Sequence, residues 1–389
     1  MSDEHPVSTG PLPPGSTIGI VGGGQLGRMS ALAARPLGYR VVALDPDEAC
    51  PAAGVVDRLI TAPYDEARAL DALAEAADVV TFEFENVPAP GLERLRAQVP
   101  VHPSPEVLAT CRDRELEKTF LAKHGFPVAA HRFASWASEL EDAARALGTP
   151  SIAKATTLGY DGKGQARLED PEDAGRVFQA IGSGRVVLER LVPFDAELSI
   201  SVARGIGGER RTFAPVRNEH RHHVLDVTTA PSGLPAAVER RAIEIADGIA
   251  DALDLVGVLA VELFLVGGDL IVNELAPRPH NSYHHSIEAC VTSQFEQHVR
   301  AVAGLPLGDT TLRQPAAMVN LLGDLWAGGE PPWTSVLGAE RAHLHLYGKR
   351  EARPGRKMAH LTVLDDTVDE ARRRALALRS ALFHGAAAR

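Results

Sequence analysis

The chain has 389 residues, of which 45% are hydrophobic and 23% are charged, and its formal net charge at pH 7 is -11. At roughly 100–200 residues per domain, this length predicts a folded protein of about two to four domains, and the composition is not that of a disordered chain. The acidic balance argues against nucleic acid as a partner, because proteins that bind nucleic acid usually carry a basic surface.

The first residues are polar and rich in proline, glycine and serine, so we expect a disordered tail over residues 1–16. They lack the cationic start and apolar core of a signal peptide, and no apolar run of the sequence is long enough to span a bilayer. Cys50, Cys111 and Cys290 are spaced too widely for a disulfide framework or a zinc pattern. We therefore expect a cytoplasmic protein with reduced thiols and no membrane partner.

Residues 17–110 are expected to form an α/β domain. Apolar runs rich in β-branched residues predict strands at residues 17–21, at 41–44 and within 78–84, and a helical pattern covers residues 26–37. Strands that alternate with helices favour a parallel, Rossmann-like sheet.

Residues 111–310 predict a second domain of mixed α+β type, and residues 311–389 predict a small C-terminal domain. The elements expected in the second domain are helices at 112–124 and 239–253, strands at 151–155, 186–191, 198–203 and 212–216, and a hairpin of residues 258–266 and 270–274. In the last part, residues 343–346 alternate as a strand does, and an Ala/Arg-rich helix begins near residue 368.

A glycine-rich sequence follows the first strand. Gly22, Gly24 and Gly27 fit the pattern G-x-G-x-x-G at the start of a helix, and Asp45 ends the next strand. This combination is typical of a dinucleotide site, so a nicotinamide cofactor is one interpretation. Glycines let backbone N–H groups approach any anion at a helix N-terminus, so we favour a general phosphate loop over a tight turn without a ligand.

Two acidic residues lie at the end of the third strand. Glu83 and Glu85 share one face by the two-residue period of a strand. Ligands of open α/β sheets bind at the carboxyl ends of strands, so either side chain could accept ribose hydroxyls. A solvated strand end fits the sequence equally well.

A second glycine-rich loop, at residues 159–164, follows the strand that contains Lys154. It lacks the G-K-[ST] end of a Walker loop. A glycine loop with a lysine on a strand can still cover a polyphosphate, with Lys154 neutralising phosphate oxygens while Tyr160 and Lys163 reach the transferred group. A flexible polar hairpin is the alternative.

Glu262 and Glu274 flank the predicted hairpin. With a three-residue loop at residues 267–269, the two carboxylates lie opposite each other with Cβ atoms about 4.5–5.5 Å apart. That spacing suits Mg2+, because two facing carboxylates repel each other without a cation. With a two-residue loop Asn273 faces Glu262 instead, and it is also an oxygen ligand. Two exposed acids at strand ends are the remaining alternative.

A dense polar run, residues 276–285, follows the hairpin. Two prolines fix its backbone, while Arg278, His280, Asn281 and Ser282 offer hydrogen-bond donors. Fixed donors could hold a small oxyanion such as bicarbonate. An ordinary proline-stiffened loop is the alternative.

A basic turn at residues 349–358 stands out in this acidic chain. Arginine and lysine side chains there could clamp a substrate phosphate. The more usual meaning of such a charge run is a solvated loop.

Together these residues resemble the 5-(carboxyamino)imidazole ribonucleotide synthase family of the ATP-grasp superfamily, which is also described as the ATPase subunit of phosphoribosylaminoimidazole carboxylase. The resemblance runs from about residue 17 to the final helix. The matching stretches are residues 24–29, 81–87, 159–165, 274–282 and 353–360. Leu158 and Tyr283 depart from the family pattern, in which glycine is common at both positions.

The resemblance implies an ATP-grasp fold in three parts, with an N-terminal pre-ATP-grasp domain, a lid at about residues 126–192 and usually a homodimer. It implies that 5-aminoimidazole ribonucleotide, ATP and bicarbonate are converted into the carboxyamino product, ADP and phosphate in de novo purine biosynthesis. Carboxyphosphate would be the intermediate, and ATP and Mg2+ are the implied cofactors.

The resemblance also implies roles for individual residues. Ligands of ATP would be Arg114, Lys154, Gly159, Tyr160, Asp161, Gly162, Lys163, Gly164, Gln165, Glu189, Arg190, Leu191, Val192, Glu197, His220, Asn273 and Glu274. Of these, residues 189–192 would offer backbone groups to adenine, and Glu197 would take the ribose. Ligands of the ribonucleotide would be Gly24, Gln25, Leu26, Glu83, Lys349, Arg356 and Lys357. Metal ligands would be Glu262 and Glu274, and the catalytic residues would be Lys154, Arg278, His280 and Asn281.

Three other functions compete with this one. An NAD-dependent dehydrogenase would use the first glycine loop, but it gives the second loop and the hairpin acids no task. Another ATP-grasp ligase, such as a formate-dependent glycinamide ribonucleotide transformylase or a biotin carboxylase, would use the same ATP site with other substrates. The third is a nucleotide-binding scaffold without catalytic activity.

Overall fold

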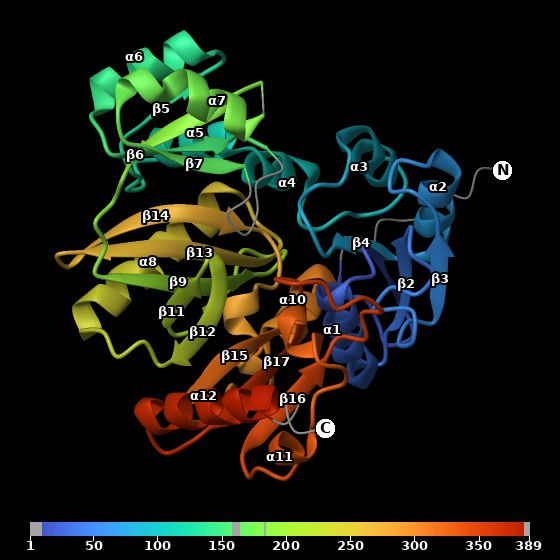
Figure 1. Ribbon diagram of the computed structural model, residues 1–389. Helices are drawn as coiled ribbons and strands as arrows, with labels where there is room; N and C mark the ends of the chain where they lie inside the picture. Colours follow the sequence, from blue (N-terminus) through green and yellow to red (C-terminus); the bar gives the residue numbers. More distant parts are fainter. Residues whose placement is uncertain (1–9, 158–163, 183, 385–389) are drawn as a thin grey trace.

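The computed structural model describes residues 10–157, 164–182 and 184–384. Figure 1 shows the N-terminal sheet at the right, a small lid at the upper left, and a large sheet that continues down to the C-terminal helix. Of the tail expected over residues 1–16, residues 1–9 lie outside the described residues. The rest contacts the fold, because Leu12 N donates to Ala303 O and the Tyr39 hydroxyl donates to Leu12 O.

The N-terminal part is a four-stranded parallel sheet in the order β3-β2-β1-β4. Its elements are β1 (Thr17–Val21), α1 (Gln25–Ala34), η1 (Arg35–Leu37), β2 (Arg40–Asp45), β3 (Arg58–Thr61), α2 (Ala67–Ala76), β4 (Val79–Phe82) and α3 (Ala89–Arg96). The predicted parallel sheet and its three predicted strands are confirmed. The predicted helix over residues 26–37 ends early, because Pro36 has no N–H to continue it.

The lid is a four-stranded antiparallel sheet in the order β5-β8-β6-β7. Its elements are β5 (His131–Ala134), α6 (Ala137–Leu147), β6 (Ser151–Ala155), β7 (Gln165–Leu168), η2 (Pro171–Asp173), α7 (Ala174–Ile181) and β8 (Val186–Arg190). Apolar side chains of α6 and α7 pack on this sheet. Both strands predicted here are confirmed, the second ending one residue early.

The large sheet has nine antiparallel strands in the order β14-β13-β9-β11-β12-β15-β17-β16, with β10 paired to β9. The strands are β9 (Ala196–Arg204), β10 (Arg210–Thr212), β11 (Val216–Arg221), β12 (Val224–Ala230), β13 (Gly257–Val266), β14 (Asp269–Ala276), β15 (Ala316–Leu322), β16 (Ala342–Leu346) and β17 (Lys357–Leu364). Because β12 pairs with β15, one sheet continues from the central part into the C-terminal part.

Helices cover this sheet and join its parts. They are α4 (Pro105–Arg112), α5 (Arg114–Lys123), α8 (Ala236–Ala252), η3 (Asn281–Tyr283), α9 (Ser286–Ala289), α10 (Gln294–Val302), η4 (Gly323–Trp326), α11 (Thr334–Leu337) and α12 (Val368–His384). The predicted helix over residues 239–253 and the predicted C-terminal helix are confirmed as α8 and α12. Within the described part of the chain, no helix has the length and apolar character needed to cross a membrane.

Two predicted elements differ from the structure at their boundaries. The helix predicted over residues 112–124 is confirmed as α5, but it begins only after Asp113, where the preceding helix α4 ends. The Asp113 carboxylate accepts the N–H groups of Glu115 at 2.8 Å and Leu116 at 3.2 Å, so a new helix begins there. The strand predicted over residues 212–216 is the gap between β10 and β11, where Pro215 offers no N–H to a ladder.

The hairpin of β13 and β14 differs from the prediction in its loop. Val266 pairs with Asp269, so the loop has two residues, Gly267 and Gly268, both with positive φ. A regular ladder from that loop would pair Glu262 with Asn273. A bulge between Glu262 and Leu263 adds one residue to β14 and pairs Glu262 with Glu274 instead. The predicted three-residue loop is therefore wrong, but the predicted facing of the two acids is confirmed.

The first glycine loop is filled by carboxylates of the chain itself. Glu83 accepts the N–H groups of Gly24 at 2.6 Å and Gly27 at 2.8 Å, and Asp45 accepts that of Gly23 at 2.7 Å. These donors at the start of α1 are the ones that a phosphate would use. The phosphate-loop interpretation is therefore wrong for these three N–H groups, because an internal anion already occupies them.

The close approach of Glu83 explains why glycine is needed here. A Cβ atom on Gly22 would lie 2.3 Å from Glu83 Cγ, and Gly22 also has φ +105°. We predict that Gly22→Ala lowers the free energy of unfolding by about 1–3 kcal/mol through strain and displacement of Glu83. Urea unfolding measures this. Gly54→Ala is the control, since a Cβ there meets nothing within 4 Å; equal losses in both variants would contradict the packing argument.

Candidate active site

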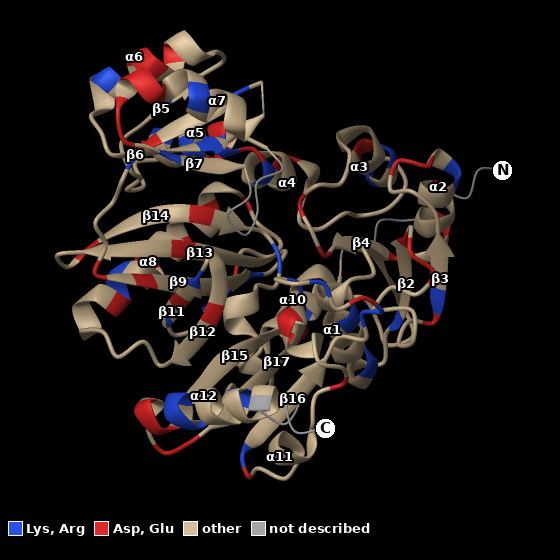
Figure 2. Cartoon of the chain, in the orientation of Figure 1, with Lys and Arg blue, Asp and Glu red and all other residues tan. Residues whose placement is uncertain are grey.

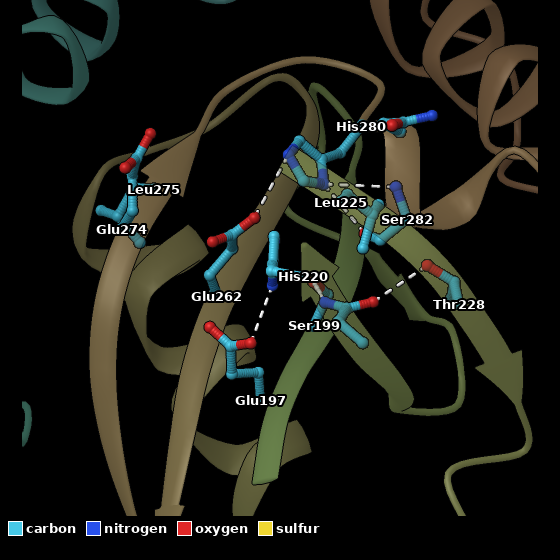
Figure 3. Close-up of polar contacts among 12 residues, drawn as sticks. Glu197, Ser199, His220, Leu225, Thr228, Glu262, Glu274, Leu275, His280 and Ser282 are labelled. Carbon is cyan, nitrogen blue, oxygen red and sulfur yellow. Dashed lines mark hydrogen bonds and ion pairs between the residues drawn. The ribbon is translucent and has the colours of Figure 1, made fainter. Parts of the chain in front are cut away.

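Polar side chains collect on one face of the large sheet. Apolar residues of β9, β13 and β14, including Ile200, Val261 and Leu275, pack against α8 on the other face. By the two-residue period of strands, Glu197, Glu262 and Glu274 point away from α8. Figure 3 shows these acids on adjacent strands, with Glu262 directed toward His280 and Glu197 toward His220.

The facing carboxylates of Glu262 and Glu274 are electrostatically unequal. Burial and the negative charge of Glu274 raise the pKa of Glu262 to about 7. Burial also acts on Glu274, but the guanidinium of Arg114, 3.1 Å away, and the ammonium of Lys154 hold its pKa below the usual range. The pair therefore carries a negative charge that a bound cation would neutralise.

The donor set near this pair consists of oxygens. Asn273, the extra residue of the bulge, has a buried Oδ1 without a hydrogen-bond partner. Among the described residues, no group of three or more His, Cys, Asp and Glu side chains is arranged as a metal cluster. Two carboxylates with open positions suit Mg2+, which binds through one or two carboxylates and completes its shell with water and phosphate oxygens.

A buried cationic cluster lies above the acids. Lys154 Nζ is 2.8 Å from Glu189 Oε2, and Lys118 Nζ is 3.3 Å from Glu189 Oε1. The two lysines and Arg114 lower the pKa of Glu189 to about 2 against the effect of its burial. Figure 2 shows basic residues on α5 above the acidic residues of β13 and β14. Sequence reasoning missed Lys118, although the helical spacing of Arg114 and Lys118 places both on one face of α5.

The predicted ribose residue Glu197 is paired with a histidine. His220 Nδ1 lies 2.8 Å from Glu197 Oε2. Burial alone would lower the pKa of His220, but Glu197 and Glu262 outweigh it and raise that pKa. The structure thus brings Glu197 and His220 together beside the facing acids.

The polar run after β14 contacts both neighbouring parts of the molecule. Arg278 Nε lies 2.7 Å from Glu85 Oε1, which follows β4 in the N-terminal part. Asn281 and Asn320 of β15 form a reciprocal amide pair at 2.6 and 3.1 Å. Glu85 is expected from the sequence either to be solvated or to bind ribose hydroxyls. In the structure its carboxylate instead forms an ion pair with Arg278.

His280 is the member of this run that reaches the facing acids. Its Nε2 lies 3.4 Å from Glu262 Oε1, and its Nδ1 lies 2.8 Å from the Ser282 hydroxyl. Burial and the positive charge of Arg278 hold the pKa of His280 well below its usual value. The neutral ring is therefore a hydrogen-bonding group at the edge of the carboxylate pair.

The basic turn is only partly directed at the site. The positive charge of Lys357 lowers the pKa values of Glu262, His220 and His280, so Lys357 acts electrostatically on the acids. Lys349 Nζ donates to Lys357 O at 2.7 Å, and Arg356 Nη1 donates to Glu351 O at 2.9 Å.

The second glycine loop cannot be placed in full. Leu158, Gly159, Tyr160, Asp161, Gly162 and Lys163 lie outside the described residues. Gly164 O accepts Ala155 N–H at 2.7 Å, and Gln165 Nε2 lies 3.3 Å from His223 Nδ1. Tyr283, the other departure from the family pattern, is fully buried, and its hydroxyl contacts the carbonyls of Ser199 and Ala214.

The nicotinamide interpretation of the N-terminal sheet has no support in this geometry. Asp45, its expected ribose ligand, is 7% exposed. Its Oδ2 accepts both the N–H of Gly23 and the hydroxyl of Tyr64. A buried carboxylate with two internal donors is not available to a ribose.

Three family models match the chain. They are an ATP-grasp domain over residues 119–295, a ribonucleotide synthetase preATP-grasp domain over residues 16–112, and a phosphoribosylaminoimidazole carboxylase C-terminal domain over residues 316–374. The expected ATP-grasp fold with an N-terminal and a C-terminal domain is therefore confirmed.

Curated relatives match over nearly the whole chain. The N5-carboxyaminoimidazole ribonucleotide synthase of Brucella melitensis is 45% identical, over 90% of this chain and 97% of that protein. The bifunctional purine synthesis protein purC/E of Dictyostelium discoideum is 44% identical over 90% of this chain, which spans 37% of that longer protein.

Solved structures agree with these matches. An ADP complex of an N5-carboxyaminoimidazole ribonucleotide synthetase has a TM-score of 0.91 at 42% identity, covering 95% of this chain and 98% of its own. The enzyme of Aspergillus clavatus, in complex with ADP and 5-aminoimidazole ribonucleotide, has a TM-score of 0.87 at 32% identity, covering 95% and 99%.

The raised pKa of Glu262 predicts a pH-dependent stability. The folded state binds this proton up to about pH 7, whereas the ordinary carboxyl loses it near 4.5. Between these values the folded state holds more protons, so this group makes the free energy of unfolding fall as pH rises. Glu262→Gln removes that loss, so the ligand-free variant should gain roughly 1–3 kcal/mol over wild type at pH 8 relative to pH 4.5.

Urea unfolding of the ligand-free proteins at the two pH values measures this difference. Glu219→Gln is the control, because Glu219 lies on the nearby strand β11 but is paired with Arg372. A gain for Glu262→Gln that is the same at both pH values would contradict the predicted titration.

Proposed function

Because the chain belongs to the N5-carboxyaminoimidazole ribonucleotide synthase family, we propose that it is an ATP-dependent ligase that carboxylates the exocyclic amine of 5-aminoimidazole ribonucleotide. Bicarbonate would supply the carboxyl group, and ADP and phosphate would be released, in de novo purine biosynthesis. The observation that carries the proposal is the facing pair of Glu262 and Glu274 beneath the cations of Arg114 and Lys154.

ATP would bind between the lid and the large sheet. Its phosphates would approach Lys154 and Arg114, whose present partners are the carboxylates of Glu189 and Glu274. A phosphate oxygen can replace a carboxylate as partner of a buried cation, because both offer charged acceptors. Glu197, beside His220, would accept the ribose hydroxyls.

Adenine would meet the strand end after β8, at residues 189–192. The N–H groups of Arg190 and Leu191 already donate to Ala130 O and Pro150 O. We therefore assign the adenine contacts to carbonyl oxygens of this segment and to the N–H of Val192.

The residues around the facing acids fit Mg2+. Glu262 and Glu274 would hold it, with the unpaired Oδ1 of Asn273 beside them. When bound, Mg2+ would neutralise the charge that builds up on the transferred phosphoryl group. Lys154 would contribute a second positive charge to the same group.

The chemistry proceeds in two stages. A bicarbonate oxygen attacks the γ-phosphorus of ATP, the bond to ADP breaks, and carboxyphosphate forms. The exocyclic nitrogen of the ribonucleotide then attacks the carboxyl carbon, either of carboxyphosphate, as its bond to phosphate breaks, or of the CO2 that carboxyphosphate releases with phosphate. In both routes the nitrogen releases a proton. Arg278, His280 and Asn281 would hold the bicarbonate through fixed donors.

The remaining predicted residues would position substrate and exclude water. Gln25 and Leu26, at the start of α1, would contact the ribonucleotide together with Gly24, and Lys349, Arg356 and Lys357 would bind its phosphate. Residues 159–165, of which 159–163 lie outside the described residues, are proposed to keep water from carboxyphosphate, which hydrolyses easily. Glu83 would hold the start of α1 in position for the ribonucleotide, because its carboxylate accepts hydrogen bonds from the N–H groups of Gly24 and Gly27.

The assembly and location of the protein also belong to this proposal. We propose a homodimer in the cytoplasm, divided at residues 17–110, 111–310 and 311–389. Sedimentation equilibrium of the purified chain tests the dimer, and a monomer at micromolar concentration would contradict it.

The function is tested by ADP release with each substrate in turn. Release should require both 5-aminoimidazole ribonucleotide and bicarbonate. Glu274→Gln should reduce it by about 10²–10³-fold, because one electrostatic contact to the transferred group is lost. Glu219→Gln, outside the site, is the control. Near-normal ADP release by Glu274→Gln would contradict the metal assignment, and release driven by formate and glycinamide ribonucleotide would favour another ATP-grasp ligase.

The basic turn is tested by Arg356→Ala. Loss of a charge-assisted hydrogen bond, worth about 1.5–3 kcal/mol, should raise the KM for 5-aminoimidazole ribonucleotide roughly 10- to 100-fold with little change in kcat. Steady-state kinetics at saturating ATP and bicarbonate measures both constants. Arg350→Ala, on an exposed position of the same turn, is the matched control. An unchanged KM for Arg356→Ala would remove this arginine from the phosphate site.

A further inference from the structure

Helix α5 presents three polar side chains to the bulged segment of β14. Arg114, Glu117 and Lys118 stand at positions i, i+3 and i+4, so they share one face of the helix. Arg114 Nη1 donates to Glu274 Oε2 at 3.1 Å, Glu117 Oε2 accepts Leu275 N–H at 2.8 Å, and Lys118 Nζ donates to Asn273 O at 2.9 Å. Three consecutive residues of β14 are thus each bonded to α5.

The bonded residues are those that the bulge displaces. In a regular ladder without the bulge, Asn273 would pair with Glu262, and Glu274 would take the position of Leu275. A one-residue slip turns every following side chain to the opposite face of a sheet. Glu274 would then point into the apolar cluster that contains Leu275 and α8 residues such as Ile245, and the facing pair would be lost.

Packing alone does not require these polar contacts. Leu121 of α5 already belongs to the apolar cluster, and Phe120 packs against it. Glu117 and Lys118 are nevertheless 1% and 0% exposed. Ionisable side chains are rarely buried to this degree unless their partners compensate them. Their partners here are backbone groups of the bulge and, for Lys118, also Glu189 of β8.

We propose that Glu117 and Lys118 are positioning residues, which hold the extra residue of β14 in place and so keep Glu274 opposite Glu262. The backbone acceptor of Asn273 and the backbone donor of Leu275 flank Glu274 on both sides. Fixing both leaves the Glu274 side chain on the site face of the sheet. The consequence for metal binding rests on the proposed function of the facing acids.

Binding of Mn2+ in the presence of ADP, followed by electron paramagnetic resonance, tests the proposal. Glu117→Leu and Lys118→Met remove the two contacts, and each should weaken Mn2+ binding about 10- to 100-fold, as loss of a supporting partner does at metal sites. For Glu117→Leu the affinity for ADP without metal should change less than about threefold. Because Lys118→Met also removes a partner of Glu189, its Mn2+ affinity is compared with wild type at saturating ADP. Glu117→Gln keeps an acceptor for Leu275 N–H and should restore Mn2+ affinity to within about threefold of wild type.

The controls separate the proposal from its premise. Glu262→Gln should lose Mn2+ binding, and if it binds as wild type does, the proposed metal site falls. In that event crystal structures of Glu117→Leu and Lys118→Met decide the register. Asn273 opposite Glu262 supports the proposed positioning role, and an unchanged Glu262–Glu274 pairing overturns it. Wild-type Mn2+ affinity in both variants, or equal losses in Glu117→Gln and Glu117→Leu, also overturns it.

If Glu117→Leu does not fold, hydrogen exchange gives the same decision. The Leu275 amide should exchange slowly in wild type and Glu117→Gln, and faster in Lys118→Met than in either. Equal protection of this amide in all three proteins would overturn the proposal.

Discussion

The repulsion between two facing carboxylates is the constraint around which the site is built. Glu262 and Glu274 share one face of the large sheet, and burial with mutual repulsion raises the pKa of Glu262 to about 7. Such a pair destabilises a ligand-free fold. A bound cation and phosphates would offset this cost in the ligand-bound protein. The positive charges of Arg114 and Lys154, which lie above the pair, already offset part of its negative charge.

The chain also uses its own carboxylates where ligands are expected. Glu83 accepts two N–H groups at the start of α1, and glycines pack so closely around it that a phosphate could not share the position. Glu189 bonds Lys154 and Lys118, but there the partners are flexible side chains beside the proposed ATP site. The first arrangement is part of the fold, whereas the second can exchange one charged acceptor for another.

The polar run after β14 is the place where the three parts of the molecule meet. Arg278 pairs with Glu85 of the N-terminal part, Asn281 with Asn320 of the C-terminal part, and His280 approaches Glu262. The proposed bicarbonate site therefore depends on all three parts being in place. These contacts with neighbouring parts fix the side chains of the polar run, so that they can act as preorganised hydrogen-bond donors.

The sequence by itself determined the parallel N-terminal sheet, the lid strands β6 and β8, the long helix α8 and the acid pair, because apolar periodicity and residue type are local properties. It did not determine how the pair is brought together. The buried apolar residues of β14 change from a spacing of two, at Leu270 and Val272, to a spacing of three at Leu275, but only pairing with β13 shows that a bulge lies there. Nor could it show that Glu83 closes the first glycine loop or that Lys118 contacts Asn273, which lies 155 residues away. Hydrogen-bond partners and strand register depend on groups far apart in the chain, and only tertiary packing decides which of them meet.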